Sequence, residues 1–297
     1  MPTIRVFVPL HVSGIWVAHY SSDPLRTGST GAGLNVSSYL VSEVRPGPCR
    51  VVLNEREVLR EPSLRACREA GVSVETRAVS PVELGKGFGL SAALLMSHCI
   101  GLYVLAEKPL TKALQLAHVL EVEHGTGLGD VVAEWIGGFE VRVEPGAPGV
   151  GRAYRIIPRT RVDLVVAELG GFESTASMLS RIPPEVYRLG SELLERVVET
   201  EDLQVFFESA RMFTSMVFDY AEARRALEGA KGVVGYYLKK SALVVWAERD
   251  RVLDVLEVLW KAGIKAKWAT ISPMGVSVVY PAQPPQKGEP ADKGKAS

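Results

Sequence analysis

Two glycine-rich segments contain the residues best placed to do chemistry. The first, residues 85–93 (GKGFGLSAA), has three alternate glycines that lead into a helix-forming stretch opened by Ser91. Glycine backbone and the free N–H groups of a first helical turn together bind phosphate well. The spacing matches neither the Walker loop nor the dinucleotide-binding fingerprint. On spacing alone, a structural turn and a phosphate-binding loop remain equally open.

The second segment, residues 124–131 (HGTGLGDV), follows its glycines with a carboxylate, Asp130. An aspartate in this position most often caps a helix. Beside a phosphate, however, a carboxylate is repelled unless it serves a metal or accepts a proton. Glu121 and Glu123 precede it, and residues two positions apart on a helix point to different sides. We select Glu121 as the candidate Mg²⁺ ligand, with an exposed helix face as the alternative for each glutamate.

A third segment near the N-terminus, residues 26–35, combines glycines with hydroxyls and one arginine, and residues 8–14 add a histidine and a serine. A flexible Gly/Ser loop is the ordinary interpretation. The alternative is a site for a small hydroxy acid, which needs a cation for its carboxylate and polar groups for its hydroxyls.

The elements around the first two segments decide whether they can meet. Residues 91–106 and 110–124 have apolar helical patterns separated by a proline. About 16 and 15 residues at roughly 1.5 Å each give two antiparallel arms of nearly equal length. The loops at 85–91 and 125–130 should therefore lie at the same end of this helical hairpin.

The remaining pattern predicts two α+β domains and a tail. The first domain covers residues 1–151 and ends in a turn-rich stretch, the second covers residues 152–282, and the polar residues 283–297 form a disordered tail. Strands are expected at residues 3–8, 51–53, 72–79, 139–143, 161–167, 232–238, 242–247 and 275–280. Further helices are expected at residues 185–198, 203–227 and 252–262. We expect the second domain to be a small α+β sandwich.

The composition is that of a globular protein without a polyanionic partner. Lys+Arg and Asp+Glu both number 34, and 47% of the residues are hydrophobic. Without an excess of positive charge, neither a nucleic acid nor a membrane surface is expected as a partner. No signal peptide and no run of about 18 apolar residues is evident, which predicts a cytoplasmic protein.

Three cysteines, Cys49, Cys67 and Cys99, make an odd total with no CxxC pair. This argues against a disulfide framework or a zinc ribbon. It favours free, buried thiols in a reducing compartment.

The glycine segments together resemble those of the GHMP small-molecule kinases and, within them, the archaeal pantoate kinases. Residues 85–93 are similar to the family motif Pro-x-x-x-Gly-Leu-Gly-Ser-Ser-Ala-Ala. Residues 126–131 resemble the segment that holds the family's catalytic aspartate, in a form close to that of pantoate kinases. Residues 9–14 and 28–35 also resemble pantoate kinases. The likeness covers residues 1–151 and weakens afterwards.

The sequence departs from the family pattern in three ways. Phe88 and Leu90 replace a leucine and the first serine of the second motif. Many members have a lysine in the first motif, where this chain has His11. The third glycine-rich motif is not evident, although residues 209–218 or 272–277 could occupy its place.

The resemblance implies a two-domain GHMP kinase-like fold. The N-terminal ATP-binding domain would resemble domain 2 of ribosomal protein S5, and the C-terminal domain a ferredoxin-like α+β sandwich. The implied reaction transfers a phosphoryl group from ATP, with Mg²⁺, to the primary hydroxyl of (R)-pantoate, giving 4-phosphopantoate on the archaeal route to coenzyme A. Mevalonate, homoserine and shikimate remain open as acceptors, and a homodimer is possible.

The resemblance also implies a role for each candidate residue. Asp130 and Ser91 would be catalytic, and Ser91 and Glu121 would bind Mg²⁺. The triphosphate would be bound by Gly85, Lys86, Gly87, Phe88, Gly89, Leu90, Ser91 and Ala92. The substrate would be bound by His11, Ser13, Arg26, Ser29, Thr30 and Gly127.

Two interpretations from other classes remain open. Residues 89–93 differ by one substitution from a G-x-S-x-G nucleophile elbow, so Ser91 could be the nucleophile of a serine hydrolase. Against this, no histidine follows His124 to complete the acid-then-histidine order of that class. Alternatively, the glycine loops could bind nucleotide without consuming it.

Overall fold

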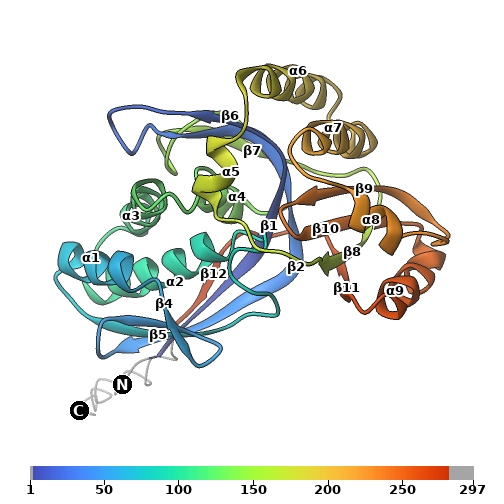
Figure 1. Ribbon diagram of the computed structural model, residues 1–297. Coiled ribbons are helices and arrows are strands. Elements are labelled where there is room, and N and C mark those ends of the chain that lie inside the picture. The colour runs from blue at the N-terminus through green and yellow to red at the C-terminus, as the bar shows by residue number, and fades with distance from the viewer. Residues whose placement is uncertain (1–2, 281–297) are drawn as a thin grey trace, which may run out of the picture.

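The computed structural model describes residues 3–280, in which two β-sheets carry helices on their faces (Figure 1). The predicted tail at residues 283–297 lies outside this part of the chain. The strands of the larger sheet are β1 Ile4–His19, β2 Gly28–Pro46, β3 Arg50–Leu53, β4 Arg56–Val58, β5 Val74–Val79, β6 Phe139–Glu144, β7 Arg152–Ile156 and β12 Ser277–Val279. Six of them lie in the order β12-β1-β2-β5-β3-β4, while β6 pairs with β2 and β7 pairs with β6. The helices of residues 3–280 are too short or too polar to span a bilayer.

Strands β1 and β2 form a hairpin that is much longer than the patterns predict. They pair along nearly their whole length, with two bulges in the register. Residues 28–35, for which a loop was the ordinary interpretation, are therefore part of a strand. Close packing explains the glycine at position 33, because a Cβ on Gly33 would lie 2.3 Å from Nε2 of His11 on the paired strand.

Four helices cover the larger sheet: α1 Arg60–Ala70, α2 Leu90–Leu105 and α4 Asp130–Ile136 pack against it, and α3 Leu110–Glu123 packs against these three helices. Helices α2 and α3 confirm the predicted helical hairpin. Most of α2 is buried because it contacts the sheet, α1, α3 and α4, which explains why it is apolar on nearly every side.

The smaller sheet consists of β8 Asp163–Glu168, β9 Val233–Lys239, β10 Ala242–Ala247 and β11 Lys265–Thr270. Its helices are α5 Thr175–Ser180, α6 Pro184–Thr200, α7 Leu203–Ser215, α8 Ala221–Ala226, the 3-10 helix η1 Arg249–Arg251 and α9 Val252–Lys261. The antiparallel order β11-β8-β10-β9 with these connections is the βαββαβ arrangement of ferredoxin-like folds, which confirms the predicted sandwich. The helix predicted at residues 203–227 is in fact two helices, α7 and α8.

The division between the two sheets differs from the predicted domain boundary after residue 151. Strand β7 follows that boundary but pairs with β6, and β12, the last strand, pairs with β1. Both belong to the larger sheet, so the chain crosses to the smaller sheet between β7 and β8 and returns at its end. A strand pattern identifies residues that pair, but it does not identify the partner strand.

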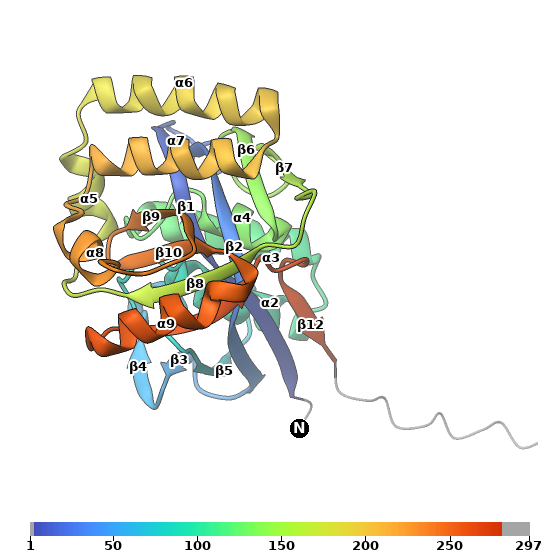
Figure 2. The same ribbon diagram turned by 90° about the vertical axis from the view of Figure 1, so that its right-hand side faces the viewer.

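A continuous hydrophobic core joins the two sheets. Helices α6 and α7 pack on β1, and α7 also packs on β9 (Figure 2). The ring centroid of Phe206 on α7 lies 4.7 Å from the ring centroid of Phe139 on β6 and 5.6 Å from that of Tyr237 on β9. The Tyr237 hydroxyl donates a hydrogen bond of 2.8 Å to the carbonyl of Val12 on β1. The end of β9 is therefore held in a defined position against the larger sheet.

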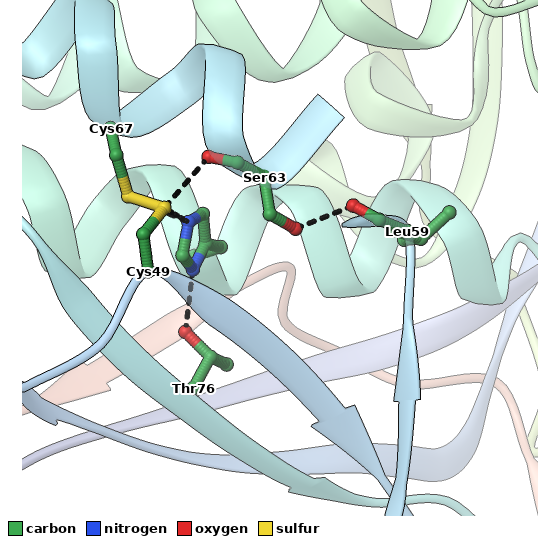
Figure 3. The surroundings of a disulfide bond; sticks show 6 residues. Cys49, Leu59, Ser63, Cys67 and Thr76 are labelled. Atoms are coloured by element: carbon green, nitrogen blue, oxygen red, sulfur yellow. Dashed lines mark hydrogen bonds between the residues drawn. A yellow bond between two sulfur atoms is a disulfide. The ribbon is translucent and has the colours of Figure 1, made fainter. Parts of the chain in front are cut away.

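Cys49 and Cys67 form a disulfide, so the prediction of free thiols is wrong for these two residues (Figure 3). Cys99 is a free, buried thiol, as predicted. Spacing did not reveal the bond because Cys49 lies just before β3 and Cys67 lies on α1, and these segments meet only in the tertiary structure. The disulfide ties α1 to the larger sheet.

Replacing both Cys49 and Cys67 by Ser should lower the free energy of unfolding by about 3 kcal/mol, because the disulfide joins residues that are 18 apart in sequence and restricts the unfolded chain. Guanidinium unfolding with and without dithiothreitol measures the effect, and the reduced wild-type protein should match the double variant. Cys99→Ser is the control, and its stability should still respond to reductant. An unfolding midpoint of the wild-type protein that ignores reductant would contradict the prediction.

Candidate active site

A cavity of about 320 Å³ lies where the two glycine loops meet the smaller sheet. The loop before α2 and the loop before α4 both line it, as the geometry of the helical hairpin predicts. Residues 172–176, which lead into α5, and residues 239–240, at the end of β9, form further parts of its wall. The cavity is therefore built by both sheets.

The glycine loop before α2 needs its glycines for conformation and for space. Gly85, Gly87 and Gly89 have φ values of 82°, 101° and 67°, which side chains disfavour. A Cβ on Gly87 would lie 2.0 Å from the carbonyl oxygen of Lys239, and one on Gly89 would lie 2.3 Å from Oε1 of Glu134. Among the described residues no side chain caps α2, so the N–H groups of its first turn remain available to an anion.

Most residues predicted to bind the triphosphate line this cavity. They are Gly85, Gly87, Phe88, Gly89, Leu90 and Ser91. The side chain of Phe88 is buried, so this residue presents backbone. Lys86 and Ala92 are outside the lining: Nζ of Lys86 donates to the carbonyl of Gly171 at 2.9 Å, and Ala92 is buried within α2.

Replacing Gly87 by Ala should weaken ATP binding at least tenfold and lower the free energy of unfolding by about 1–3 kcal/mol, because the new Cβ is strained in φ and collides with the chain at Lys239. Gly71→Ala is the matched control. Gly71 also has a positive φ, of 77°, but a Cβ there meets no atom within 4 Å. The Gly71→Ala variant should have a lower free energy of unfolding, whereas its affinity for ATP, measured by calorimetry, should stay unchanged. Equal ATP affinities of the two variants would contradict this role of the loop.

Asp130 begins α4 and lines the cavity, and its Oδ1 lies 2.8 Å from Nδ1 of His11. Although burial alone would raise its pKa, the hydrogen bond and charge of His11, with the charges of Lys239 and Arg142, hold the pKa of Asp130 well below its usual range. This carboxylate is therefore ionised at neutral pH and faces the space beside the glycine loop.

His11 is fully buried and is not part of the cavity lining. Its ring bridges Asp130 and Glu140, the latter at 3.0 Å from Nε2. Burial alone would lower its pKa, but the two carboxylates raise it above the usual histidine value. The contact of His11 with a substrate stays a prediction; in this structure the ring lies behind the cavity lining and is hydrogen-bonded to Asp130.

Glu121 is fully buried, and Oγ1 of Thr126 donates to its Oε1 at 2.5 Å, while Oε2 has no hydrogen-bond partner among the described residues. Burial, together with the charge of Asp130, raises the pKa of Glu121 to about 7 although the hydroxyls of Thr126 and Ser91 oppose the shift. Glu123 lies on the outer side of the helix and pairs with Arg65. Of the two glutamates, Glu121 is the one that lies beside Ser91, although its own side chain is buried behind the residues that line the cavity.

The residues predicted to bind the substrate are divided by the structure. Ser13, Ser29 and Gly127 line the cavity, whereas Arg26 and Thr30 do not. The Arg26 side chain is 72% exposed and lies 3.8 Å from Asp23. Oγ1 of Thr30 is hydrogen-bonded to His19 at 3.0 Å. Their roles in binding a substrate stay predictions: Arg26 lies in the connection between β1 and β2, and Thr30 follows Ser29 on β2 and so points to the opposite face.

Two lysines in the cavity wall were not predicted. Lys239 ends β9 and Lys240 follows it, and Nζ of Lys239 lies 3.3 Å from the ring centroid of Trp16. Burial lowers the pKa of Lys239 to about 7. Nζ of Lys240 donates to Thr175 at 2.8 Å, and Thr175 donates to the carbonyl of Thr126 at 2.7 Å. In the sequence these lysines look like the exposed turn of a hairpin, so no pattern distinguished them.

Solved structures with this fold include kinases and a phosphotransferase. A protein described as a phosphotransferase related to the coenzyme A biosynthesis pathway is 24% identical, with a TM-score of 0.78 and coverage of 93% of this chain and 98% of that chain. Mevalonate-3-kinase from Thermoplasma acidophilum has a TM-score of 0.66 at 12% identity, covering 95% of this chain and 98% of that chain. The fold is that of the GHMP small-molecule kinases, as the glycine segments predict.

Sequence comparison narrows the likeness to pantoate kinases. The pantoate kinase of Thermococcus kodakarensis is 34% identical over 162 residues, which cover 50% of this chain and 54% of that protein. The pantoate kinase of Methanocaldococcus jannaschii is 32% identical over 155 residues, covering 48% of this chain and 54% of that protein. The chain thus spans about half the length of the pantoate kinases that it matches. No protein-family model matches the chain.

Proposed function

We propose that this protein is an ATP-dependent kinase that phosphorylates the primary hydroxyl of (R)-pantoate to give 4-phosphopantoate, on the archaeal route to coenzyme A. One observation carries the proposal: the open N-terminus of α2 and the ionised carboxylate of Asp130 line the same cavity. An anion site beside a fixed carboxylate suits transfer of a phosphoryl group to an alcohol. The likeness to pantoate kinases supports the choice of acceptor. The cytoplasmic location and the homodimer stay predictions.

In this mechanism the backbone of the glycine loop and the first turn of α2 bind the triphosphate of ATP. Ser13 and Ser29, which line the cavity, are candidates for the hydroxyls of the substrate. The acceptor hydroxyl oxygen forms a bond to the γ-phosphorus, the bond from that phosphorus to the bridging oxygen breaks, and ADP leaves. The hydroxyl proton passes to Asp130. Because Asp130 is a weak base, it contributes mainly by orienting the hydroxyl, and most of the rate comes from positioning.

The residues beside the loop fit a Mg²⁺ ion. Glu121 offers a buried carboxylate with one unpartnered oxygen, and the hydroxyl of Ser91 lines the cavity next to it. Oxygen ligands of this kind are those that Mg²⁺ prefers. When bound, the ion would supply positive charge to the phosphate oxygens. Glu121 and Ser91 would hold it, and Thr126 would orient the carboxylate through its hydrogen bond.

The serine hydrolase interpretation receives no support from the surroundings of Ser91. Ser91 follows the turn before α2 rather than a buried strand, which an elbow requires. Among residues 3–280, the histidine that contacts the site's aspartate is His11, and its two ring nitrogens are both occupied by carboxylates. His124 also lines the cavity, with its Nδ1 hydrogen-bonded to the carbonyl of Leu120, and within residues 3–280 no hydrogen bond joins Ser91 to a histidine.

The proposed function is tested by incubating the purified protein with Mg-ATP and separately with pantoate, mevalonate, homoserine and shikimate. Phosphorus NMR and mass spectrometry of the products identify the phosphorylated alcohol and its position. We expect 4-phosphopantoate and stoichiometric ADP. If another alcohol were phosphorylated instead, the protein would still be a kinase, but pantoate would not be its substrate. If the protein bound ATP and phosphorylated none of the four alcohols, the proposed kinase activity would be wrong.

A further inference from the structure

The cationic side chains near the cavity differ in whether their N–H groups already have hydrogen-bond or ion-pair partners. A bound triphosphate brings several negative charges, and the lysines that line the cavity are Lys239 and Lys240. Lys240 already donates to Thr175. Lys86 is tied to the carbonyl of Gly171 outside the lining, and Arg142 is buried in an ion pair with Glu140. Lys239 contacts the face of the Trp16 ring, which leaves N–H groups of its ammonium free for other acceptors.

The position of Lys239 is fixed by both sheets. Its carbonyl packs against Gly87 so closely that a Cβ there would lie 2.0 Å away, so the strand end and the glycine loop touch. Trp16, on β1, holds the ammonium at 3.3 Å from the ring centroid. Two residues earlier on β9, Tyr237 hydrogen-bonds to β1. Together these contacts place a lysine from the smaller sheet beside the loop that binds the triphosphate in the proposed function.

We propose that Lys239, held against Trp16, is a catalytic residue that contacts the transferred phosphoryl group of ATP. This inference rests on the proposed function and adds to it the contribution of the smaller sheet. As charge spreads over the equatorial oxygens of that group in the transition state, the ammonium neutralises it. Its charge also favours the ionised form of Asp130. The same ammonium thus neutralises charge on the phosphoryl group and keeps the carboxylate that orients the acceptor ionised.

The surroundings of Lys239 make its charge sensitive to pH near neutrality. Asp130 on α4 and Glu173 before α5 favour the charged form, whereas burial, Lys240 and Arg142 on β6 oppose it. The result is a pKa of about 7 in the free protein. Above that pH an increasing fraction of the free protein has a neutral Lys239, so kcat/KM for ATP should fall as the pH rises.

The experiment compares Lys239→Met and Lys239→Arg with the wild-type protein, using the acceptor that the wild type phosphorylates. Lys239→Met should lower kcat about 100-fold and change KM for ATP much less. Lys239→Arg should recover part of kcat and should abolish the fall of kcat/KM above pH 7, since arginine stays charged. Lys108→Met is the matched control, because Lys108 also lies over an aromatic ring, that of Tyr103, outside the residues that line the cavity.

A second measurement does not depend on the acceptor. Trace labelling of lysines with acetic anhydride at a series of pH values, followed by peptide mass spectrometry, should show Lys239 becoming reactive around pH 7 and protected by ATP, with Lys108 unprotected. A Lys239→Met protein that folds and retains kcat within threefold, or labelling of Lys239 that ATP does not reduce, would overturn the inference. If the wild type phosphorylates no alcohol, the proposed function fails, while the labelling still decides whether Lys239 meets the triphosphate.

Discussion

Asp130→Asn should lower kcat by about 1000-fold or more and leave the affinity for ADP within about threefold of the wild type. Asparagine has nearly the shape of aspartate, so α4 and the cavity should persist. It cannot accept the hydroxyl proton, and it loses the charge that His11, Lys239 and Arg142 stabilise. The predicted result is a protein that binds nucleotide and fails to transfer the phosphoryl group. Steady-state kinetics and calorimetry with ADP measure the two quantities.

The control for this variant is Asp250→Asn, an exposed aspartate of η1 outside the residues that line the cavity, which should keep full activity. A thermal melt checks that Asp130→Asn is folded. If Asp130→Asn retained more than a tenth of the wild-type kcat, Asp130 would have no part in the chemistry. If ADP affinity fell as steeply as kcat, the residue would be shaping the nucleotide site instead.

The second large effect concerns Glu121, whose replacement by Gln should lower activity about 100-fold or more and raise the Mg²⁺ concentration for half-maximal rate at least tenfold. The buried carboxylate with an unpartnered oxygen is the strongest candidate ligand of the ion. Because its pKa is about 7, a proton competes with the cation. The apparent affinity of the wild-type protein for Mg²⁺ should therefore rise as the pH increases through 7.

The same substitution should stabilise the protein in the absence of metal. An unfolded glutamate loses its proton near pH 4.5, whereas folded Glu121 retains it up to about pH 7. Between these values the folded state binds more protons, so the contribution of Glu121 to stability decreases as the pH rises and is lowest above 7. Glu121→Gln removes this penalty. It should be more stable than the wild type at pH 8 by on the order of 2 kcal/mol, and similar at pH 4.5.

Unfolding in EDTA at the two pH values measures this gain. Glu123→Gln provides the matched control from the same helix, because Glu123 pairs with Arg65 on the outer side and should give no stabilisation at pH 8. A Glu121→Gln protein that is less stable than the wild type at pH 8 would show that the carboxylate is not desolvated as described. Unchanged Mg²⁺ dependence would remove it from the metal site.

These two carboxylates show how neighbouring residues acquire different tasks. Asp130 is held ionised by His11 and by the cations around it, whereas Glu121 is kept protonated up to neutral pH by burial and by the charge of Asp130. Groups with separated pKa values can serve separate functions in one site. In the proposed mechanism, one carboxylate orients the acceptor and the other exchanges its proton for a cation.

The local features of the glycine loops could be predicted from the sequence because they depend on short-range physical chemistry. Alternate glycines before an apolar helix predict a tight loop at the helix start, and two helices of similar length place the loops at residues 85–91 and 125–130 at one end. Helical periodicity predicted that Glu121 and Glu123 point to different sides, and the structure buries Glu121 and pairs Glu123 with Arg65. Composition placed Arg26 and Thr30 in one candidate segment, but it could not show that both side chains lie outside the cavity lining, because that depends on the pleat of β2 and on the path of the chain before it.

The sequence by itself determined the α+β class of the fold and the position of the two glycine loops at one end of the helical hairpin, with Asp130 after the second loop, since these features depend on residues close together in the chain. The tertiary structure alone decided that His11 supports Asp130, that Cys49 and Cys67 are bonded, and that Lys239 reaches the cavity. These contacts join residues between 18 and more than 100 positions apart, and they depend on how two sheets pack through a common core. Periodicity and spacing carry no information about such pairings, because the free energy that selects them comes from burial of surfaces that the chain brings together only on folding.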